Sequence, residues 1–410
     1  MNILLIHQYF LEDDDAGGSR FNEMVKLWEA KGHKVTVLAG MVHYTKGVKR
    51  DRYKGKFVVK RKQGNTEVYR CHVSEAYNVN FLGRLWAYFS FVFSSLFVGI
   101  FKIKEKNDLI LVTSPPLFVG ITAYFISRLK RIPFVFEVRD LWPESAIDTG
   151  VLKNKLIIKL AYWFEAFLYR KAKLINVLTP AFKEALIKKN VPKDKIIFIP
   201  NAADFSLSEK VLMSDFDRES FRVANGLDGK FVVTYVGAHG VANALGQVID
   251  VAQRVTDTNV LFLLIGEGME KIQIKEHAKS LGLTNVRFID AVPKLEVFKY
   301  IIASEMGMSV LKNVPTFKTI YSNKTFDYMS CKKPILMAID GVSRQLVEES
   351  ESGTFIKPED ANDFERVIRR YLKEPQSLSK EGESGYGYAV KYFDRSKLAE
   401  QYLNSLEKMI

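Results

Sequence analysis

Short apolar runs rich in β-branched residues alternate with segments of helical periodicity, and this alternation most constrains the fold. In the first half of the chain the runs lie at 2–7, 34–39, 68–72, 109–113, 134–138 and 174–178. Strands that alternate with helices form βαβ units, which build a parallel sheet with helices on its faces. The sequence therefore predicts an α/β fold for this half.

The same alternation begins again after Pro200. Here the apolar runs lie at 231–236, 260–265, 286–289, 306–310, 334–338 and 353–356. A chain of 410 residues is too long for one ordinary hydrophobic core. We therefore expect two Rossmann-like domains, 1–200 and 201–385, that face each other across a ligand-binding cleft. The segment 386–410 is expected to end in a helix, 395–409, that packs back towards the first domain.

The net charge of +13 and the pI near 9.3 indicate an anionic partner, such as nucleic acid, anionic lipid or a phosphorylated substrate. Much of the basic charge of the first half flanks apolar and aromatic sequence, which favours a membrane surface over nucleic acid. Cys71 and Cys331 lie far apart and match no metal-ligand spacing. We therefore expect a reducing, cytoplasmic compartment and no structural zinc site. We expect no secretory signal, because the first residues show neither a basic n-region nor a small-residue cleavage site.

A glycine pair, Gly17 and Gly18, follows the first apolar run and precedes a helix expected at 21–31. Open parallel sheets bind ligands at the carboxyl ends of their strands, where glycine lets the backbone come close to the ligand. We interpret the pair as a ligand-binding loop, and a flexible turn is the alternative. The acidic run 13–15 stands before the pair and is interpreted as a solvated turn.

Three runs of the second half end in groups that suit a phosphate or a nucleobase. Gly237 and Gly240 belong to a strand-to-helix turn, which is a signal for phosphate approach. Glu267 and Lys271 belong to a second glycine turn, with Lys271 near a helix start. The loop that contains Val292 follows the third run, and its backbone could read the edge of a nucleobase.

The segment 322–337, SNKTFDYMSCKKPILM, places Lys324 and Asp327 three residues apart at an expected helix start. The free N–H groups and the positive end of the helix dipole attract anions, so Lys324 and its neighbour Asn323 are well placed for a diphosphate. Asp327, one turn further on, suits the hydroxyls of a sugar or a ribose. A surface Lys–Asp pair is the alternative interpretation.

In their order and spacing these segments resemble those of the retaining glycosyltransferases of family 4, which have the GT-B fold. The motifs that carry the resemblance are the turn at 235–240, G-E-G-x-x-K at 266–271, N-V-x-F-x-x-x-V-P at 285–293 and K-x-x-D-Y-M-x-x-x-K-P at 324–334. The segments 114–117 and 138–145 are similar to the subgroup that builds O-antigen, capsule and other lipid-linked surface glycans, including fucosamine transferases. The segment 200–204 resembles the interdomain hinge of the family.

The resemblance implies transfer of a sugar from a nucleotide diphosphate donor, with retention at the anomeric carbon, no bound metal and no further cofactor. Negative charge grows on the leaving diphosphate as the glycosidic bond breaks, and without a metal ion other positive groups must stabilise that charge. The candidates for this role are Lys324 and the backbone N–H groups at Gly17, Gly18 and Gly240.

Two positions depart from the family pattern. The paired acids of the family lie eight residues apart; Asp327 fills the second place, but Thr319 stands in the first. Thr319 or a nearby backbone N–H is therefore expected to hold the hydroxyls of the donor sugar. Many members carry an arginine after the first strand of the second domain. In this chain His239 is expected to take part of that role, with a structural histidine as the alternative.

The acceptor site is expected in the first domain, where Arg139, Asp140 and Glu144 follow the run 134–138. We predict that Asp140 orients the acceptor hydroxyl or the donor sugar, that Arg139 lies near a diphosphate, and that Glu144 lies beside the acceptor. Asp140 also suits a helix cap with Pro143 in the first turn, so a structural role is the alternative.

Two segments of the first domain indicate membrane contact. The run 85–101, LWAYFSFVFSSLFVGIF, has nearly the length of a membrane span. Because it falls between strands of one domain, we prefer shallow insertion or burial on the sheet to a transmembrane helix. The segment 152–174 mixes basic and aromatic residues, which is typical of an interfacial helix. A core helix with a basic solvent face is the alternative.

Together these features predict a cytoplasmic enzyme, peripherally bound to the inner face of the cell membrane. It is expected to move a hexose, N-acetylhexosamine or deoxyaminohexose from a UDP-sugar to a polyprenyl-diphosphate-linked acceptor. One alternative is a sugar-nucleotide 2-epimerase of the same fold, which needs a general base. The other is a catalytically silent scaffold for glycan assembly, because Thr319 stands in the place of an acid. No nucleic acid partner is expected.

Overall fold

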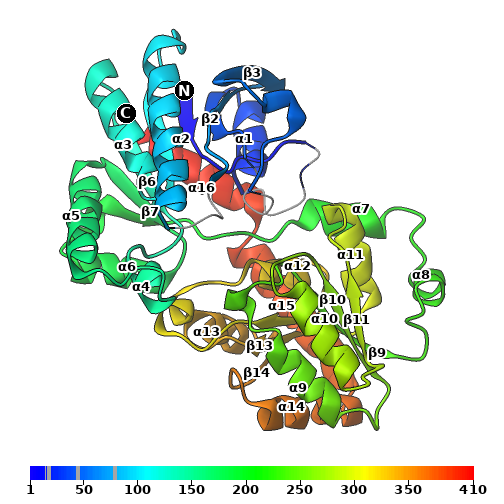
Figure 1. The fold of residues 1–410 in the computed structure, drawn as a ribbon. Helices are drawn as coiled ribbons and strands as arrows, with labels where there is room; N and C mark the ends of the chain where they lie inside the picture. The colour runs from blue at the N-terminus through cyan, green and yellow to red at the C-terminus, as the bar shows by residue number, and fades with distance from the viewer. Residues whose placement is uncertain (14, 16–19, 43–46, 77–80) are drawn as a thin grey trace. The chain divides into compact units, whose positions relative to one another are not determined.

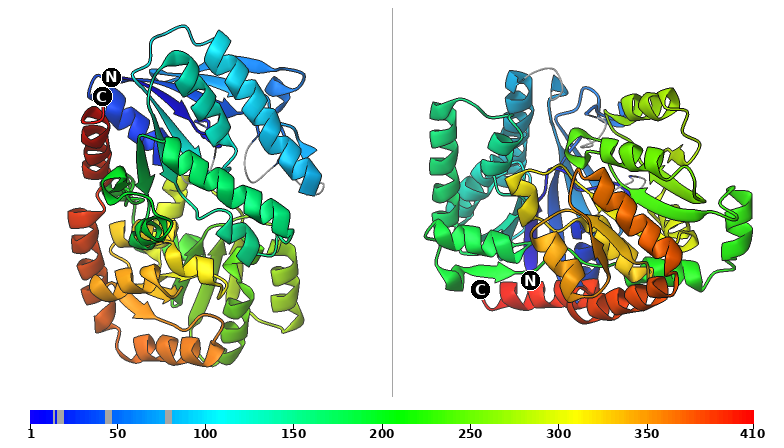
Figure 2. Two further views of the ribbon diagram at one scale, coloured as in Figure 1. Left: turned by 90° about the vertical axis from the view of Figure 1, so that its left-hand side faces the viewer. Right: turned by 90° about the horizontal axis from the view of Figure 1, so that it is seen from below.

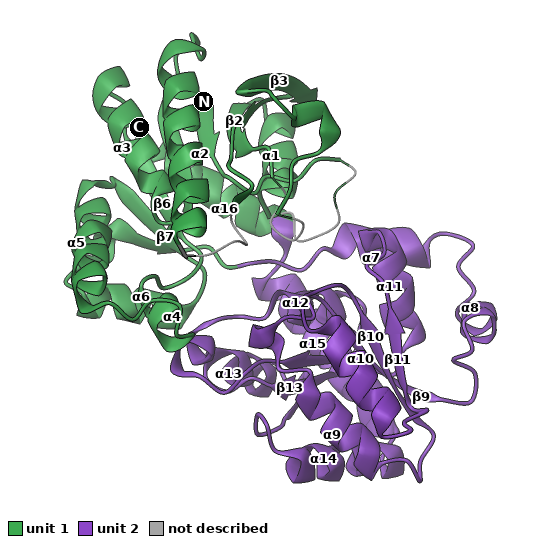
Figure 3. Ribbon diagram, viewed as in Figure 1, with its two compact units in different colours: residues 1–200, 396–410 green, residues 201–395 purple. Residues whose placement is uncertain are grey.

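The computed structural model describes residues 1–13, 15, 20–42, 47–76 and 81–410. The chain divides into two compact units, one of residues 1–200 and 396–410 and the other of residues 201–395 (Figure 3). Each unit is built around one sheet (Figure 1). The molecule is therefore α/β with two sheet domains, as the sequence predicts.

The sheet of the first unit has the strand order β3-β4-β2-β1-β5-β6-β7-β8, and all neighbours are parallel except β3 and β4. The strands are β1 (Asn2–Ile6), β2 (Lys34–Gly40), β3 (Val58–Gln63), β4 (Thr66–Cys71), β5 (Leu109–Ser114), β6 (Phe134–Val138), β7 (Leu174–Val177) and β8 (Ile196–Phe198). The sequence prediction missed β3 and β8. The first of these is a basic edge strand without a continuous apolar run, and the second has only three residues.

Helices cover this sheet (Figure 2). They are α1 (Arg20–Ala30), α2 (Phe81–Phe101), α3 (Val119–Lys130), α4 (Glu144–Asp148), α5 (Lys155–Lys171), α6 (Pro180–Lys188) and α16 (Arg395–Glu407). Trp28 joins α1 to α16: its indole N–H donates to the Ala399 carbonyl at 2.9 Å, and its ring meets Tyr402 edge-on with centroids 5.8 Å apart. The last helix thus packs within the first unit.

The sheet of the second unit is parallel throughout, in the order β11-β10-β9-β12-β13-β14. Its strands are β9 (Phe231–Val236), β10 (Val260–Ile265), β11 (Val286–Ile289), β12 (Met306–Val310), β13 (Ile335–Ala338) and β14 (Gly353–Phe355). The helices are α7 (Phe205–Leu212), α8 (Arg218–Ala224), α9 (Gly246–Arg254), α10 (Lys271–Ser280), α11 (Lys294–Ala303), α12 (Asn323–Ser330), α13 (Val342–Glu349), α14 (Ala361–Lys373) and α15 (Gln376–Tyr392).

The strand order of the second unit reverses between β9 and β12. In open α/β sheets, ligands bind outside the carboxyl ends of the strands at such a switch point. The turn that follows β9 contains Gly237 and Gly240 and leads through a 3-10 turn, Val241–Asn243, into α9. The segment that follows β12 leads through a second 3-10 turn, Pro315–Thr319, into α12. Both predicted donor segments therefore start at the switch point.

The chain passes between the units twice, after Pro200 and after Arg395. The segments beside these two crossings run in parallel, because the Ala203 N–H donates to the Phe393 carbonyl at 2.9 Å and Ala203 pairs with Asp394 in a β-bridge. The returning segment was expected to start at 386. In the structure α15 continues to Tyr392 within the second unit, since its Ala389 is buried in the same core as α12.

Candidate active site

Lys324 lies in the first turn of α12, beside the turn that follows β9. Its Nζ stands 4.8 Å from the centre of the Tyr235 ring. Its Cε packs against Gly237 so closely that a Cβ on this glycine would lie 3.2 Å away. The ammonium group donates a long hydrogen bond of 3.4 Å to Ser322 Oγ. Burial lowers the pKa of Lys324 to about 8, although the charge of Asp327 acts in the opposite direction.

Buried hydroxyl groups hold the first turn of α12 at the end of β12. Ser309 Oγ lies 3.2 Å from both Ser322 Oγ and Thr325 Oγ1, and the Ser322 N–H donates to Ser343 Oγ at 3.3 Å. Ser322 is the N-cap residue, but its side chain caps no N–H of α12 within the described part of the chain. The start of α12 therefore keeps backbone donors that an anion could use.

Tyr328 fixes α12 against the strands on both sides of the switch point. Its hydroxyl accepts a hydrogen bond from the Val236 N–H at 3.1 Å and lies 3.1 Å from the Met308 carbonyl, to which it can donate. Its ring covers Gly307, where a Cβ would lie 2.3 Å from the ring. The sequence analysis did not assign Tyr328 a role, although this tyrosine belongs to the D-Y-M motif.

Asp327 belongs to a cluster of four charges. Lys294 Nζ lies 4.0 Å from Asp327 Oδ1 and 3.3 Å from Asp204 Oδ2, and Arg395 Nη2 lies 3.8 Å from Asp204. Burial raises the pKa of Asp327, while Lys294 and Arg395 oppose this shift. Burial also acts to raise the pKa of Asp204, but Arg395 and Lys294 outweigh it and lower the value. Lys294 and Arg395 were not predicted, because nothing local in the sequence links them to α12.

Asn323 connects the start of α12 to the first crossing. It is exposed, and its Oδ1 accepts a hydrogen bond from Asn201 Nδ2 at 2.5 Å. Asn201 and Asp204 both belong to the hinge-like segment 200–204. This segment therefore reaches α12 twice, directly at Asn323 and through Lys294 at Asp327.

The glycine turns that follow β9 and β10 touch through their backbones. A Cβ on Gly266 would lie 1.9 Å from the Gly237 carbonyl oxygen, and a Cβ on Gly268 would lie 2.3 Å from the His239 carbonyl oxygen. Only glycine fits at Gly266 and Gly268 for this reason. The contact is closed by a hydrogen bond of 2.8 Å from the His239 N–H to the Glu267 carbonyl. These glycines therefore position the turn that carries Gly240.

The His239 side chain is fully buried beneath this contact. Neither ring nitrogen has a hydrogen-bond partner among the described residues, and the ring meets Phe288 edge-on at 6.3 Å. Burial, and then the charge of Lys271, lower the pKa of His239 to about 4. A neutral, enclosed imidazole does not replace an arginine that binds phosphate. This placement favours the structural alternative for His239.

Lys271 ties the ends of β10 and β11 together. Its Nζ lies 2.8 Å from the Gly266 carbonyl, 2.8 Å from Glu267 Oε1 and 2.6 Å from Asp290 Oδ1. Burial acts to lower the pKa of Lys271, but the hydrogen bonds to Asp290 and Glu267 outweigh it and raise the value. The ion pairs of Lys271 thus hold the loop that follows β11 in place, and Val292 of this loop is half-buried.

Thr319, which stands in place of the first acid, ends the 3-10 turn before α12. It is half-buried, and its Oγ1 donates to the Thr316 carbonyl at 2.6 Å. A hydroxyl oxygen has two lone pairs and can therefore also accept hydrogen bonds.

In the first unit, Asp140 follows β6 directly. Ser145 Oγ donates to Asp140 Oδ2 at 2.6 Å. Burial, with a smaller effect of Glu144, raises the pKa of Asp140 to about 6 against the opposing hydrogen bond from Ser145. The helix after it, α4, starts only at Glu144 and has Pro143 at its N-cap, so Asp140 is not the cap of α4.

The two neighbours of Asp140 have different surroundings. The Arg139 N–H donates to the Ser114 carbonyl at 3.0 Å, and the Arg139 charge helps burial to lower the pKa of His7, which follows β1. Arg139 therefore lies at the carboxyl edge of the sheet. Glu144 pairs with Lys189 at 2.7 Å, and Lys189 also pairs with Glu165 at 2.6 Å, so one lysine serves both carboxylates.

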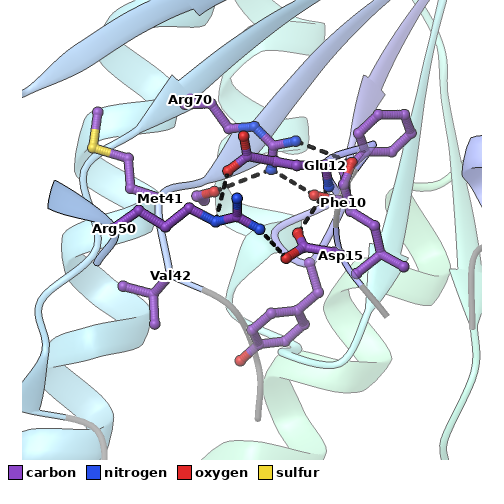
Figure 4. A pocket seen from close by; sticks show the side chains of 10 residues that line it. Phe10, Glu12, Asp15, Met41, Val42, Arg50 and Arg70 are labelled. Carbon is purple, nitrogen blue, oxygen red and sulfur yellow. Dashed lines mark hydrogen bonds and ion pairs between the residues drawn. The ribbon is translucent and has the colours of Figure 1, made fainter. Parts of the chain in front are cut away.

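A small pocket also lies at this edge, beyond the ends of β1, β2 and β4 (Figure 4). It encloses about 20 Å³, close to the room that one water molecule needs. Arg50 pairs there with Glu12 and Asp15. Arg70 donates to backbone carbonyls and to a side-chain amide, those of Phe10, Leu11 and Gln63.

Both arginines of this pocket therefore already have partners within the protein, carboxylates for Arg50 and carbonyl oxygens for Arg70. Asp15, which was expected in a solvated turn, instead pairs with Arg50 and has a side chain only 12% exposed. The two arginines were not predicted as a pair, because they come from different segments that only the sheet brings together. The predicted glycine pair, Gly17 and Gly18, lies outside the described residues.

Two family models match the chain. One is described as a glycosyl transferase 4-like domain and matches residues 16–202, and the other is described as glycosyl transferases group 1 and matches residues 217–387. The chain belongs to the family 4 glycosyltransferases of the GT-B fold. The family, the fold and the enzyme class predicted from the sequence are confirmed.

Known proteins similar to this glycosyltransferase agree with the match. It is 26% identical over 287 residues to WcaI of Escherichia coli, whose name describes a glycosyl transferase of colanic acid biosynthesis, and the alignment covers 68% of this chain and 70% of WcaI. The structure is similar to sucrose-phosphate synthase from Thermosynechococcus elongatus, with a TM-score of 0.77, 16% identity and coverage of 100% and 98%. It is also similar to HepE of Anabaena in complex with UDP and glucose, with a TM-score of 0.72, 17% identity and full coverage of both chains.

Proposed function

We propose that this glycosyltransferase moves a sugar, with retention, from a UDP-sugar to a polyprenyl-diphosphate-linked glycan in the synthesis of a bacterial surface polysaccharide. The sugar is a hexose, an N-acetylhexosamine or a deoxyaminohexose. The enzyme works on the cytoplasmic face of the cell membrane. One observation carries the proposal: the Lys324 ammonium group lies on the Tyr235 ring at the start of α12, beside backbone donors that no side chain caps in the described chain.

The leaving diphosphate needs the groups that meet at this point. As the bond between the anomeric carbon and the diphosphate breaks, negative charge grows on the phosphate oxygens. Lys324 and the first N–H groups of α12 are already held in place by Tyr328 and the buried hydroxyl groups. Preorganised donors of this kind stabilise developing charge without the cost of reorganisation. The arrangement supports a donor site that works without a bound metal or other cofactor.

The rest of the donor would extend from Lys324 along the carboxyl edge of the second unit. Asp327 offers a carboxylate one turn further along α12 for the hydroxyls of the ribose or the sugar. Thr319 offers a hydroxyl oxygen on the segment before the helix. The loop at Val292, which the Lys271–Asp290 pair holds in place, offers backbone groups to the base. Gly237 and Gly240 let the turn after β9 come close to the phosphates.

In the first unit, Asp140 would orient the hydroxyl of the acceptor. A carboxyl group whose pKa is about 6 is mostly ionised at neutral pH, so it can accept a hydrogen bond from a sugar hydroxyl. Arg139 would lie beside the diphosphate of the lipid carrier. Glu144, which its pair with Lys189 holds in place, would help to position the acceptor.

The comparisons support the choice of donor and pathway. HepE, which shares the fold, was solved with UDP and glucose. WcaI, which shares about a quarter of the aligned residues, is named for the synthesis of colanic acid. Neither protein fixes the sugar that this chain transfers, so the proposal names only a class of donor.

A thermal-shift panel of UDP, GDP, ADP, CMP and NAD, with and without EDTA, tests the donor site. A ligand that binds only the folded protein raises its melting temperature by mass action. We expect a shift with UDP that survives EDTA. A shift that EDTA abolishes would contradict metal-independent binding, and a shift with GDP or ADP alone would change the donor.

The Lys324→Ala variant tests the catalytic role directly. Removing one preorganised donor to a developing oxyanion typically costs about 10²–10³ in rate. We expect a loss of this size in transfer, with the melting temperature of the free protein little changed. The matched control is Lys279→Ala, at an exposed lysine on α10. Equal activity of both variants would refute the assignment of Lys324.

A further inference from the structure

Three helices of the first unit present large apolar side chains to solvent. The most exposed of these are Leu82, Phe93 and Phe101 on α2, Leu129 on α3, and Leu156 and Trp163 on α5, each between 59% and 73% exposed. On α2 and α5 the spacing of these side chains is that of one side of the helix. Contiguous apolar patches of this kind mark interaction surfaces on soluble proteins.

Aromatic contacts join these helices into one surface. Phe118, at the start of α3, lies 4.9 Å from Phe89 of α2 and 6.1 Å from Phe164 of α5, measured between ring centroids. Tyr124 of α3 meets Phe167 of α5 at 4.9 Å. Figure 1 shows α2 and α3 side by side within the unit. We call the exposed apolar surface of α2, α3 and α5 the lipid face.

The opposite side of α2 is built into the unit. By length and composition, the stretch Leu82–Phe101 could cross a membrane. However, Ser94 Oγ donates to the His72 carbonyl at 2.7 Å, and Ser95 Oγ lies 3.0 Å from Thr122 Oγ1 of α3. Crossing a bilayer would break these buried contacts. The helix therefore offers only its exposed side to an outside partner.

The charges around the lipid face match an anionic partner. Exposed cations stand at the ends of the apolar stripes, with Lys102 after α2, Arg128 on α3, and Lys155 and Lys159 on α5. Lysine beside exposed aromatic residues suits an anionic lipid surface, because its stem lies along apolar groups while the ammonium reaches the head groups. Lysine is depleted in protein–protein interfaces, so a second copy of the chain fits this chemistry less well.

The lipid face continues to the predicted acceptor site. The Phe118 ring, which joins the three helices, lies 5.7 Å from the Trp142 ring. Trp142 stands two residues after Asp140 in the chain. An apolar path therefore leads from the exposed helices to Trp142, in the segment that carries the carboxylate that we assign to the acceptor.

We propose that the lipid face rests in the head-group region of an anionic phospholipid bilayer, and so brings Asp140 to the level of a membrane-borne diphosphate. The second part of this inference rests on the proposed function. The lipid contact itself does not, because it follows from the exposed side chains and charges of the first unit.

The native tryptophans test the contact. Trp86 and Trp163 are exposed on the lipid face, whereas Trp28 is buried. Vesicles of brominated phosphatidylglycerol should quench the fluorescence of the full-length protein, because bromine quenches only tryptophans that it nearly touches. In Trp86→Phe/Trp163→Phe most of this quenching should disappear. Quenching that stays the same in this variant would overturn the proposal.

Vesicle flotation tests whether the apolar side chains of the lipid face contribute to membrane binding. We expect Phe93→Ser/Leu156→Ser to lower the fraction bound to phosphatidylglycerol vesicles at least tenfold. The control is Met213→Ser/Ile272→Ser, which removes still more exposed apolar side chains from the second unit and should float like the parent protein. Binding by the parent protein should be weaker to phosphatidylcholine and at high salt. Equal flotation of both variants would overturn the proposal. A parent protein that is dimeric, with a monomeric Phe93→Ser/Leu156→Ser variant, would also overturn it, because the face would then bind a second copy of the chain.

The UDP thermal shift, measured on the same variants, separates the two proposals. Lost flotation with an intact UDP shift confirms the lipid face and shows that the variant is folded. An absent UDP shift in a parent protein that floats normally refutes the donor assignment and leaves the lipid face standing.

Discussion

The protonation state of Lys324 decides whether the proposed donor site offers the positive charge of an ammonium group. Burial lowers the pKa of this lysine to about 8, and the Tyr235 ring face replaces only part of the lost hydration. A diphosphate beside the ammonium group would raise the pKa again. Donor binding and proton binding are therefore linked at alkaline pH.

This linkage predicts the alkaline limb of the rate profile. We expect kcat/KM to fall as the pH rises above about 8, because the free enzyme then loses the Lys324 proton. In Lys324→Arg the limb should move to higher pH, since a guanidinium stays charged. Steady-state rates across the alkaline range give the measurement. A limb at the same pH in both proteins would show that another group titrates.

Burial of His239 predicts that the free energy of unfolding falls as the pH is lowered. Its pKa is about 4 in the folded protein and about 6.5 when unfolded, so protons bind the unfolded chain more strongly. The resulting destabilisation is absent above pH ~6.5 and grows to about 3 kcal/mol as the pH falls to about 4.

The His239→Leu variant should remove this destabilisation. Relative to the parent protein, its free energy of unfolding should rise as the pH is lowered from about 8 to about 5. Denaturant unfolding at several pH values gives the measurement. The control is His277→Gln, at an exposed histidine on α10, for which we expect no such trend. A constant difference between parent and His239→Leu would contradict the burial of a neutral ring.

At the scale of secondary structure, α12 joins the proposed donor contacts to the rest of the second unit. It carries Lys324 and Asp327, contacts the first crossing through Asn323, and reaches β9 and β12 through Tyr328. The cluster around Lys294 links α12 to both segments that join the units. A change in this cluster should therefore affect stability and donor binding together.

Lys294→Met isolates that effect. It removes the cation between Asp204, which is buried, and Asp327. Without Lys294, Asp327 loses one of its compensating cations and Asp204 keeps its pair with Arg395. We therefore expect a loss of about 2–3 kcal/mol in unfolding free energy and weaker UDP binding. Lys299→Met on the same helix is the control, because its pair with Glu296 lies nearer the surface and should contribute little. Equal effects of the two changes would refute the cluster's role.

The elements differ in how far the sequence predicts them. The strands of the second unit are predicted to within a residue at each end, because each belongs to a short, mainly apolar run that alternates with segments of helical periodicity. The edge strand β3 is missed because its charged residues face solvent. Lys324 is found because a local motif carries it, whereas Lys294, Arg395, Arg50 and Arg70 acquire their partners only when distant segments fold together.

At the scale of the whole molecule, each unit has its own sheet and its own core. The proposed donor contacts on α12 and its neighbouring turns belong to the second unit. A ligand stabilises the part of a protein that it binds, in proportion to its concentration over its dissociation constant. The two units should therefore respond differently to UDP.

Calorimetry of the full-length protein should separate the two responses. We expect two unfolding transitions, of which UDP raises one by several degrees and leaves the other almost unchanged. In Lys324→Ala the shift should be much smaller, whereas Asp140→Asn should keep it, because Asp140 lies in the first unit. A single transition that UDP raises as a whole would show that the units unfold together.

The first unit contains both ends of the chain, and the second is one uninterrupted stretch whose two ends lie hydrogen-bonded beside each other. In the sequence, the second unit is thus an insertion between two segments of the first unit. Recombination at two points, near Pro200 and near Ser396, can exchange it whole, and the two ends of the incoming unit lie side by side. Donor preference can then change while the first unit is inherited intact.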